Sequence, residues 1–138
     1  MRWVLLALAV LGITASSLAL REHYRTDASP CDINERWDCG IVNHSPYAVI
    51  GGVPVAVIGI AGYLVLGILS LRRAYRLMLV GALAGLAFSL YLARIEEHVL
   101  GVWCIYCAIS LGAISLITLL LIATVLRNYS GVLRPRSN

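Results

Sequence analysis

Four stretches of apolar residues, separated by polar or charged segments, divide this chain. They cover residues 3–20, 47–71, 77–93 and 104–126. Each comes close to the roughly 20 residues that a helix needs to cross the hydrocarbon core of a bilayer. Within a bilayer the backbone polar groups of a single segment are satisfied only by a helix. The pattern therefore predicts an all-α membrane bundle of four helices.

The second stretch is longer than one straight span requires, and Gly51-Gly52-Val53-Pro54 would interrupt a helix near its start. Proline is tolerated in a first helical turn, so we expect a short interfacial piece followed by a helix from about residue 54. The first stretch imitates a secretory signal, but it exceeds the roughly 7–15 apolar residues typical of one. We predict a retained helix there. The expected helices are 3–20, 54–71, 77–93 and 104–126, with an outer loop over 21–53, in one domain of residues 1–138.

Composition excludes a soluble globular protein. Hydrophobic residues make up 60% of the 138 residues and charged residues 13%, whereas soluble domains average about 45–50% and about 25%. We expect the membrane itself, and no nucleic acid, among the partners.

The charged residues predict the orientation of the bundle. All eleven basic residues are Arg, and seven of them lie at one end of the predicted helices: Arg2, Arg72, Arg73, Arg76, Arg127, Arg134 and Arg136. The loops at the opposite end carry all seven acidic residues. Because cytoplasmic loops are enriched in Arg and Lys, we expect both termini in the cytoplasm. The loops over 21–46 and 94–103 then face outward.

Four cysteines fall on the outward side, where a bacterial periplasm or exterior permits disulfides. Cys104 and Cys107 stand three residues apart at the start of the fourth stretch, so they share one face of a helix. The first turn of a helix favours a thiolate. Cys31 and Cys39 lie in the first outer loop.

Three interpretations of the cysteines remain open at this point. They can form two structural disulfides, or a zinc site assisted by His23, His44 and His98, although only the CxxC pair has usual zinc-ligand spacing. The third interpretation is an electron relay, because a mobile loop pair can exchange disulfides with a pair at the membrane edge. Its acceptor must be reachable from the bilayer, since Cys107 lies deeper than Cys104. A quinone meets that requirement.

Several blocks of sequence, in their order and spacing, carry a resemblance to a known family. They are Cys31-Asp-Ile-Asn through Cys39, Ser45, Gly52-Val-Pro-Val-Ala-Val-Ile-Gly59, Ser89-Leu-Tyr-Leu-Ala93 and Cys104-Ile-Tyr-Cys107. Together they resemble the vitamin K epoxide reductase (VKOR) family over nearly the whole chain. The resemblance implies a membrane four-helix bundle around a quinone pocket, and a quinone-dependent thiol oxidoreductase.

The resemblance also implies a role for each cysteine. The loop pair, matching Cys31 and Cys39, would take electrons from a thioredoxin-like partner. Cys39 would then form a mixed disulfide with Cys104 and free Cys107 to react with menaquinone, ubiquinone or vitamin K. Ser45 matches a family serine beside the pocket, and from its position before Pro46 it is equally a helix N-cap. Because the chain carries no fused thioredoxin-like domain, we expect the partner to be a separate protein. We also expect the protein to lie in a bacterial cytoplasmic membrane.

The chain departs from the animal members of that family at two positions. Animal members have a tyrosine four residues after the last cysteine, where this chain has Leu111, and a pocket asparagine that aligns with Val55. Asn43, His44 and Ser110 are candidate polar substitutes. Quinone reduction coupled to disulfide formation is therefore favoured over epoxide reduction of the animal type.

Overall fold

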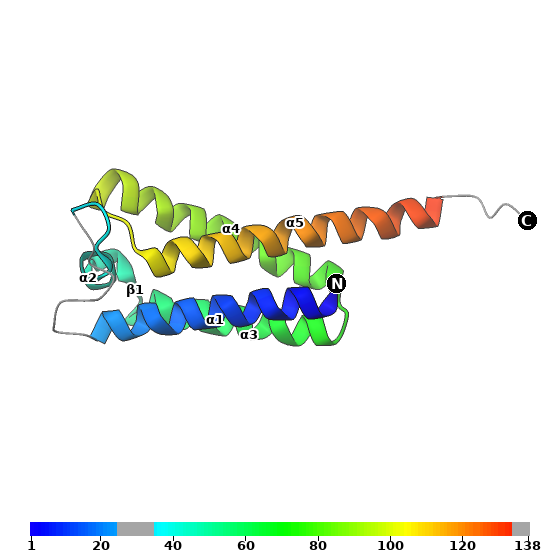
Figure 1. Ribbon diagram of the computed structural model, residues 1–138, viewed down its shortest axis with the longest axis horizontal. Coiled ribbons are helices and arrows are strands. Elements are labelled where there is room, and N and C mark those ends of the chain that lie inside the picture. The colour runs from blue at the N-terminus through cyan, green and yellow to red at the C-terminus, as the bar shows by residue number, and fades with distance from the viewer. Residues whose placement is uncertain (25–34, 134–138) are drawn as a thin grey trace, which may run out of the picture.

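The computed structural model describes residues 1–24 and 35–133 as an all-helical bundle (Figure 1). Its four principal helices are α1 (Arg2–Tyr24), α3 (Val55–Leu71), α4 (Tyr75–Ile95) and α5 (Ile105–Leu133). In Figure 1 the N-terminus lies at the end of the bundle beyond which α5 projects, and α2 (Cys39–His44) lies at the opposite end. The predicted all-α membrane bundle of four helices is confirmed.

Three of these helices are long and apolar enough to cross a membrane: Arg2–Tyr24, Tyr75–Leu100 and Ile105–Gly131. The helix α3 has 17 residues and so rises about 26 Å at about 1.5 Å per residue. That length is near the lower limit for a span of a bilayer whose core is about 30 Å thick. The many large apolar side chains on the outside of the bundle, such as Leu64, Leu83 and Leu119, suit contact with lipid.

The four helices share one apolar core. Leu5 of α1, Leu66 of α3, Met78 of α4 and Ile117 of α5 are all buried in the same cluster. Two helices approach closely at Gly12, where a Cβ atom would overlap the ring of Tyr63. Small residues permit this kind of approach between membrane helices. The contact fixes α1 against α3 near the middle of both helices.

The start of the second apolar stretch is not helical throughout, as its glycines predicted. A 3₁₀ turn (η1, Pro46–Ala48) leads into a two-stranded hairpin of β1 (Val49–Ile50) and β2 (Val53–Pro54). Gly51 and Gly52 form its turn with φ of +58° and +83°, the left-handed conformation that glycine adopts without a steric penalty. Pro54 then occupies the N-cap of α3.

Three helices extend beyond their predicted C-terminal ends, although α4 does so only to Ile95 rather than residue 93. The helix α1 continues to Tyr24 rather than residue 20, and α5 continues to Leu133 rather than 126. These two longer extensions carry polar residues, and helices project into the aqueous phase without loss of their internal hydrogen bonds. The helix α4 is followed directly by a π-helical turn, η2 (Glu96–Leu100), which ends at Gly101 with φ of +69°.

Candidate active site at the α2 end of the bundle

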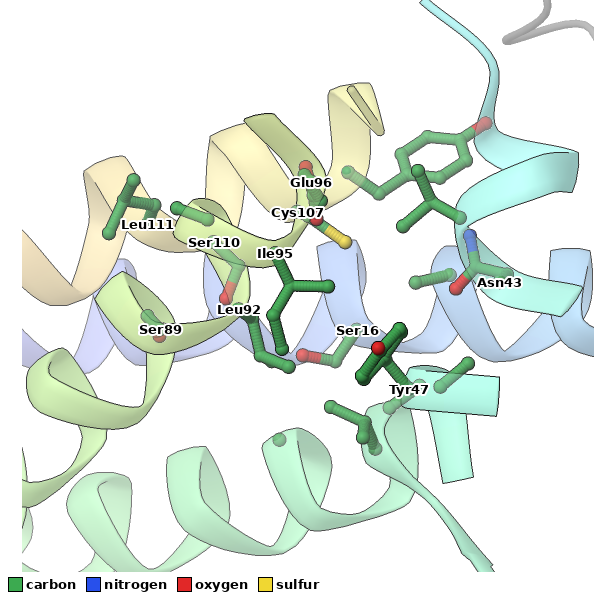
Figure 2. Close-up of a pocket in the computed structure, with 18 of the residues that line it drawn as sticks. Ser16, Asn43, Tyr47, Ser89, Leu92, Ile95, Glu96, Cys107, Ser110 and Leu111 are labelled. Carbon is green, nitrogen blue, oxygen red and sulfur yellow. The ribbon is translucent and has the colours of Figure 1, made fainter. Parts of the chain in front are cut away.

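A cavity opens between the ends of the helices at the end of the bundle that carries α2 (Figure 2). Its volume is about 120 Å³, and its wall is mainly apolar. The polar side chains in the wall come from α1, α2, α4, η2 and α5 and from the segment after α2: Ser16, His23, Asn43, Ser45, Tyr47, Ser89, Glu96, Tyr106, Cys107 and Ser110. An apolar hollow with a few converging polar groups is the usual form of a small-molecule site.

Cys104 and Cys107 lie at this cavity but in different surroundings. Cys104 stands immediately before α5, is fully buried, and packs against Val42 and Val102. Cys107 belongs to the first turn of α5, and its sulfur is directed into the cavity (Figure 2). Both side chains carry a thiol group, and the thiol of Cys107 donates a hydrogen bond to the sulfur of Cys104. The sulfur of Cys107 therefore faces the cavity, whereas the sulfur of Cys104 lies on the side of α2.

The hydrogen bond from Cys107 lowers the pKa of the Cys104 thiol, because it stabilises the thiolate. Burial opposes that effect, and the side-chain amide of Asn43 assists it by donating to the Cys104 sulfur at 3.5 Å. A hydrogen bond of 2.7 Å between the backbone carbonyl oxygen of Asn43 and His23 Nδ1 holds Asn43 in place. Contacts between α1, α2 and the start of α5 thus favour a thiolate on Cys104.

Replacing Asn43 with Leu is expected to raise the pKa of Cys104, because the thiolate loses one of its donors. The fraction of Cys104 thiolate at neutral pH then falls, and thiol–disulfide exchange at this sulfur slows at neutral pH and recovers as the pH rises. Thiolate absorbance measured against pH, in a Cys31→Ala/Cys39→Ala background, follows the change. His44→Gln is the matched control, because His44 is exposed next to Asn43. An unchanged titration in the Asn43 variant would contradict the role of this amide.

The segment before α2 is joined by backbone hydrogen bonds to the segment before α5. The Asp38 N–H donates to the Trp103 carbonyl at 2.9 Å, and the Trp103 N–H donates to the Arg36 carbonyl at 2.7 Å. The rings of Trp37 and Trp103 lie 6.5 Å apart. Asp38 also caps α2, since its Oδ1 accepts the Ile41 N–H at 3.0 Å. The next residues along the two paired segments are Cys39 and Cys104.

The remaining predicted site residues occupy different positions. Ser45 and Ser110 both line the cavity. The Ser45 hydroxyl donates to the Val42 carbonyl at 2.8 Å, and Ser45 makes no side-chain capping bond to the 3₁₀ turn that follows it. The Ser110 hydroxyl lies 2.9 Å from the Tyr63 hydroxyl, which joins α3 to α5. Cys31 lies outside the described residues.

Comparison with known families assigns the chain to one of them. Residues 3–124 match the profile of the vitamin K epoxide reductase family. The protein belongs to the VKOR family. No curated protein matched the chain. Members of this family are quinone-dependent thiol oxidoreductases, so the protein is a multi-pass integral membrane enzyme that uses a quinone.

The two positions at which the sequence predicts a departure from the animal members both lie in the cavity wall. Val55 begins α3, and Leu111 lies in α5 one residue beyond Ser110. Both are apolar, so neither supplies a hydrogen bond to a bound ring. The polar groups of the wall come instead from other positions, among them Asn43, Glu96 and Ser110 (Figure 2).

Glu96 is a site residue that sequence reasoning missed. From the sequence it was counted only among the acidic residues of the loops, whereas in the structure Glu96 is 4% exposed and lines the cavity. Its Oε2 accepts the backbone N–H of Cys104 at 3.4 Å. The only signal in the sequence was its position eight residues before Cys104. That spacing does not by itself predict a contact, because the π-helical turn that lies between the two residues decides their separation.

A zinc site finds no support in the described part of the chain. Within residues 1–24 and 35–133, no group of three His, Cys, Asp or Glu side chains is placed to hold a metal ion. The rings of His23 and His44 are stacked with centroids 6.4 Å apart, while His98 is exposed on η2.

Proposed function

We propose that this VKOR protein carries electrons from a separate thioredoxin-like partner to a quinone and thereby supports disulfide bond formation. Electrons enter at Cys31 and Cys39, pass from Cys39 to Cys104, and leave from Cys107. In each cycle the partner's two thiols become a disulfide, and the quinone gains two electrons and two protons to become a hydroquinone.

The observation that carries this proposal is the asymmetry of the CxxC pair. Cys107 lines the apolar cavity, whereas Cys104 is fully buried on the side of α2. A lipid-soluble acceptor in the cavity meets the sulfur of Cys107 first. A thiolate arriving from the outer loop meets Cys104 first, so the two sulfurs suit two different reaction partners.

The backbone pairing beside Trp103 supports the step between the loop and the membrane pair. Asp38 is bonded to Trp103, and the residues that follow them are Cys39 and Cys104. Attack of a Cys39 thiolate on the Cys104–Cys107 disulfide forms the Cys39–Cys104 bond and releases the sulfur of Cys107.

The cavity supports a quinone head group as the ligand. Its volume of about 120 Å³ is below the roughly 300–1,000 Å³ of pockets that enclose a whole drug-sized ligand. A flat ring is then held beside Cys107, and the isoprenoid tail extends between the helices toward lipid. Asn43, Ser45 and Ser110 are the polar residues that we propose to contact the ring or to shape its site.

Quinone reduction is favoured over epoxide reduction of the animal type. Val55 and Leu111 present apolar atoms to the cavity at the positions where animal members carry asparagine and tyrosine. A site without those hydrogen bonds binds a quinone ring mainly through apolar contact and Cys107.

We further propose that residues 1–138 form one domain in a bacterial cytoplasmic membrane, with both termini inside. The α3–α4 turn, which carries Arg72 and Arg73, lies at the same end of the bundle as the N-terminus (Figure 1). The cavity and the acidic outer segments lie at the other end and face the periplasm or exterior.

Anaerobic reduction of quinones by the purified, fully reduced protein tests this function. The four cysteines hold four electrons, so each chain is expected to convert up to two molecules of menaquinone or ubiquinone to the hydroquinone while its thiols become disulfides. Vitamin K epoxide, tested in parallel, is expected to remain unreduced. Failure to reduce any quinone would contradict the proposal, and turnover of the epoxide would support the animal-type activity in its place.

A further inference from the structure

Glu96 occupies a position between the two sulfurs and the cavity. Both of its hydrogen bonds to described residues go to the cysteine pair, one from the Cys104 N–H at 3.4 Å and one from the Cys107 thiol. It also lines the cavity beside Cys107, as Figure 2 shows. A carboxyl group is costly to bury, and a π-helical turn such as the one that begins at Glu96 frequently marks a functional site.

The chemistry at Cys107 requires a proton acceptor. In the reduced pair the single S–H of Cys107 is shared between two acceptors, the Cys104 sulfur and the Glu96 carboxylate. The thiolate, not the thiol, is the nucleophile, so Cys107 has to lose that proton before its sulfur reacts. The quinone, in turn, has to gain protons as it is reduced.

Glu96 is the only carboxyl group among the described residues that line the cavity. His23 is another possible base in the wall, but it belongs to α1, and its hydrogen bond runs from Nδ1 to the backbone carbonyl of Asn43 at 2.7 Å rather than to either sulfur. A proton acceptor has to lie within hydrogen-bonding reach of the proton that it removes, and Glu96 meets this requirement.

We propose that Glu96 is a catalytic residue that transfers a proton from the Cys107 thiol to the quinone, an inference that rests on the proposed quinone reduction. The Cys107 thiol gives its proton to the Glu96 carboxylate, and Glu96 passes it to one oxygen of the forming hydroquinone. The Cys104 and Cys107 sulfurs join in a disulfide as their two electrons go to the quinone. The proton that Cys104 releases to water is balanced by the second proton that the hydroquinone takes from water, and Glu96 ends the cycle as a carboxylate.

A single-turnover experiment isolates this step. In a Cys31→Ala/Cys39→Ala background, Cys104 and Cys107 are the only thiols, and after reduction they are mixed anaerobically with menadione. Glu96→Gln keeps an oxygen for the Cys104 N–H but no longer accepts a proton. We expect it to slow menadione reduction about 100-fold or more, since general acid–base catalysis typically contributes about 10²–10⁴-fold. Glu97→Gln, at the exposed neighbouring acid, is the matched control and is expected to stay within about twofold of the parent rate.

Chemical rescue separates proton transfer from a structural role. In Glu96→Ala, added formate is expected to restore part of the rate, because a small carboxylate can enter the space that the side chain leaves. Formate is expected to have no effect on the parent or on Glu97→Gln. A Glu96→Gln protein as fast as the parent would overturn the proposal, and so would a slow Glu96→Ala protein that formate does not accelerate. If the parent itself fails to reduce menadione, menaquinone and ubiquinone, the proposed function fails rather than the role of Glu96.

Discussion

Replacing Cys107 with Ala is expected to reduce quinone reduction to the uncatalysed background while the protein remains folded. Cys107 is the cysteine whose sulfur reaches the cavity, and Cys104 is fully buried on the side of α2. Without the Cys107 sulfur, no thiolate in the described part of the chain faces an acceptor in that cavity. The loss is measured as the rate of hydroquinone formation, with a reduced thioredoxin-like partner as the electron donor.

The control for this variant is Ser110→Ala, which removes a hydroxyl from the cavity wall one turn further along α5 but leaves every cysteine in place. It is expected to retain activity and to change chiefly the quinone concentration that the enzyme needs. Thermal unfolding of both variants shows whether the bundle is intact. Full quinone reduction by a folded Cys107→Ala protein would refute the assignment of the acceptor to this sulfur.

Replacing Cys104 with Ala is expected to stop the same overall reaction by a different route. Cys104 is the sulfur that Cys39 attacks in the proposed relay, so its loss prevents the Cys39–Cys104 disulfide from forming. The Cys107→Ala protein, in contrast, retains Cys104 and is expected to accumulate that mixed disulfide under oxidising conditions, because the sulfur that would displace it is missing. Mass spectrometry of the linked peptides distinguishes the two variants.

The control for the trapped disulfide is Cys39→Ala/Cys107→Ala, in which the Cys39–Cys104 link is impossible. A Cys107→Ala protein that instead links Cys31 to Cys104 would show that the other loop cysteine makes the attack. If the Cys39–Cys104 disulfide forms in equal amounts with and without Cys107, the Cys107 sulfur does not displace it, and the different roles proposed for Cys104 and Cys107 are contradicted.

The sequence alone was sufficient to predict the helical bundle. Apolar stretches of about 20 residues have one way to satisfy their backbone in lipid, so their number and approximate limits predict the fold. The interruption at Gly51 and Gly52 was also predictable, because the hairpin there needs positive φ. The helix ends were less predictable, since α1 and α5 continue through polar residues that a hydropathy pattern assigns to loops.

The sequence also predicted that the two thiols lie close together, because a spacing of three residues at the start of a helix brings their side chains near each other. Only the tertiary structure decided which sulfur faces the cavity and what surrounds each of them. Asn43 reaches Cys104 across 61 residues of sequence, and Glu96 turns inward although the outer turn that holds it is short and acidic. The physical reason is that burial and hydrogen bonding at this site depend on how α1, α2 and the α4–α5 connection pack together, and no local pattern records that packing.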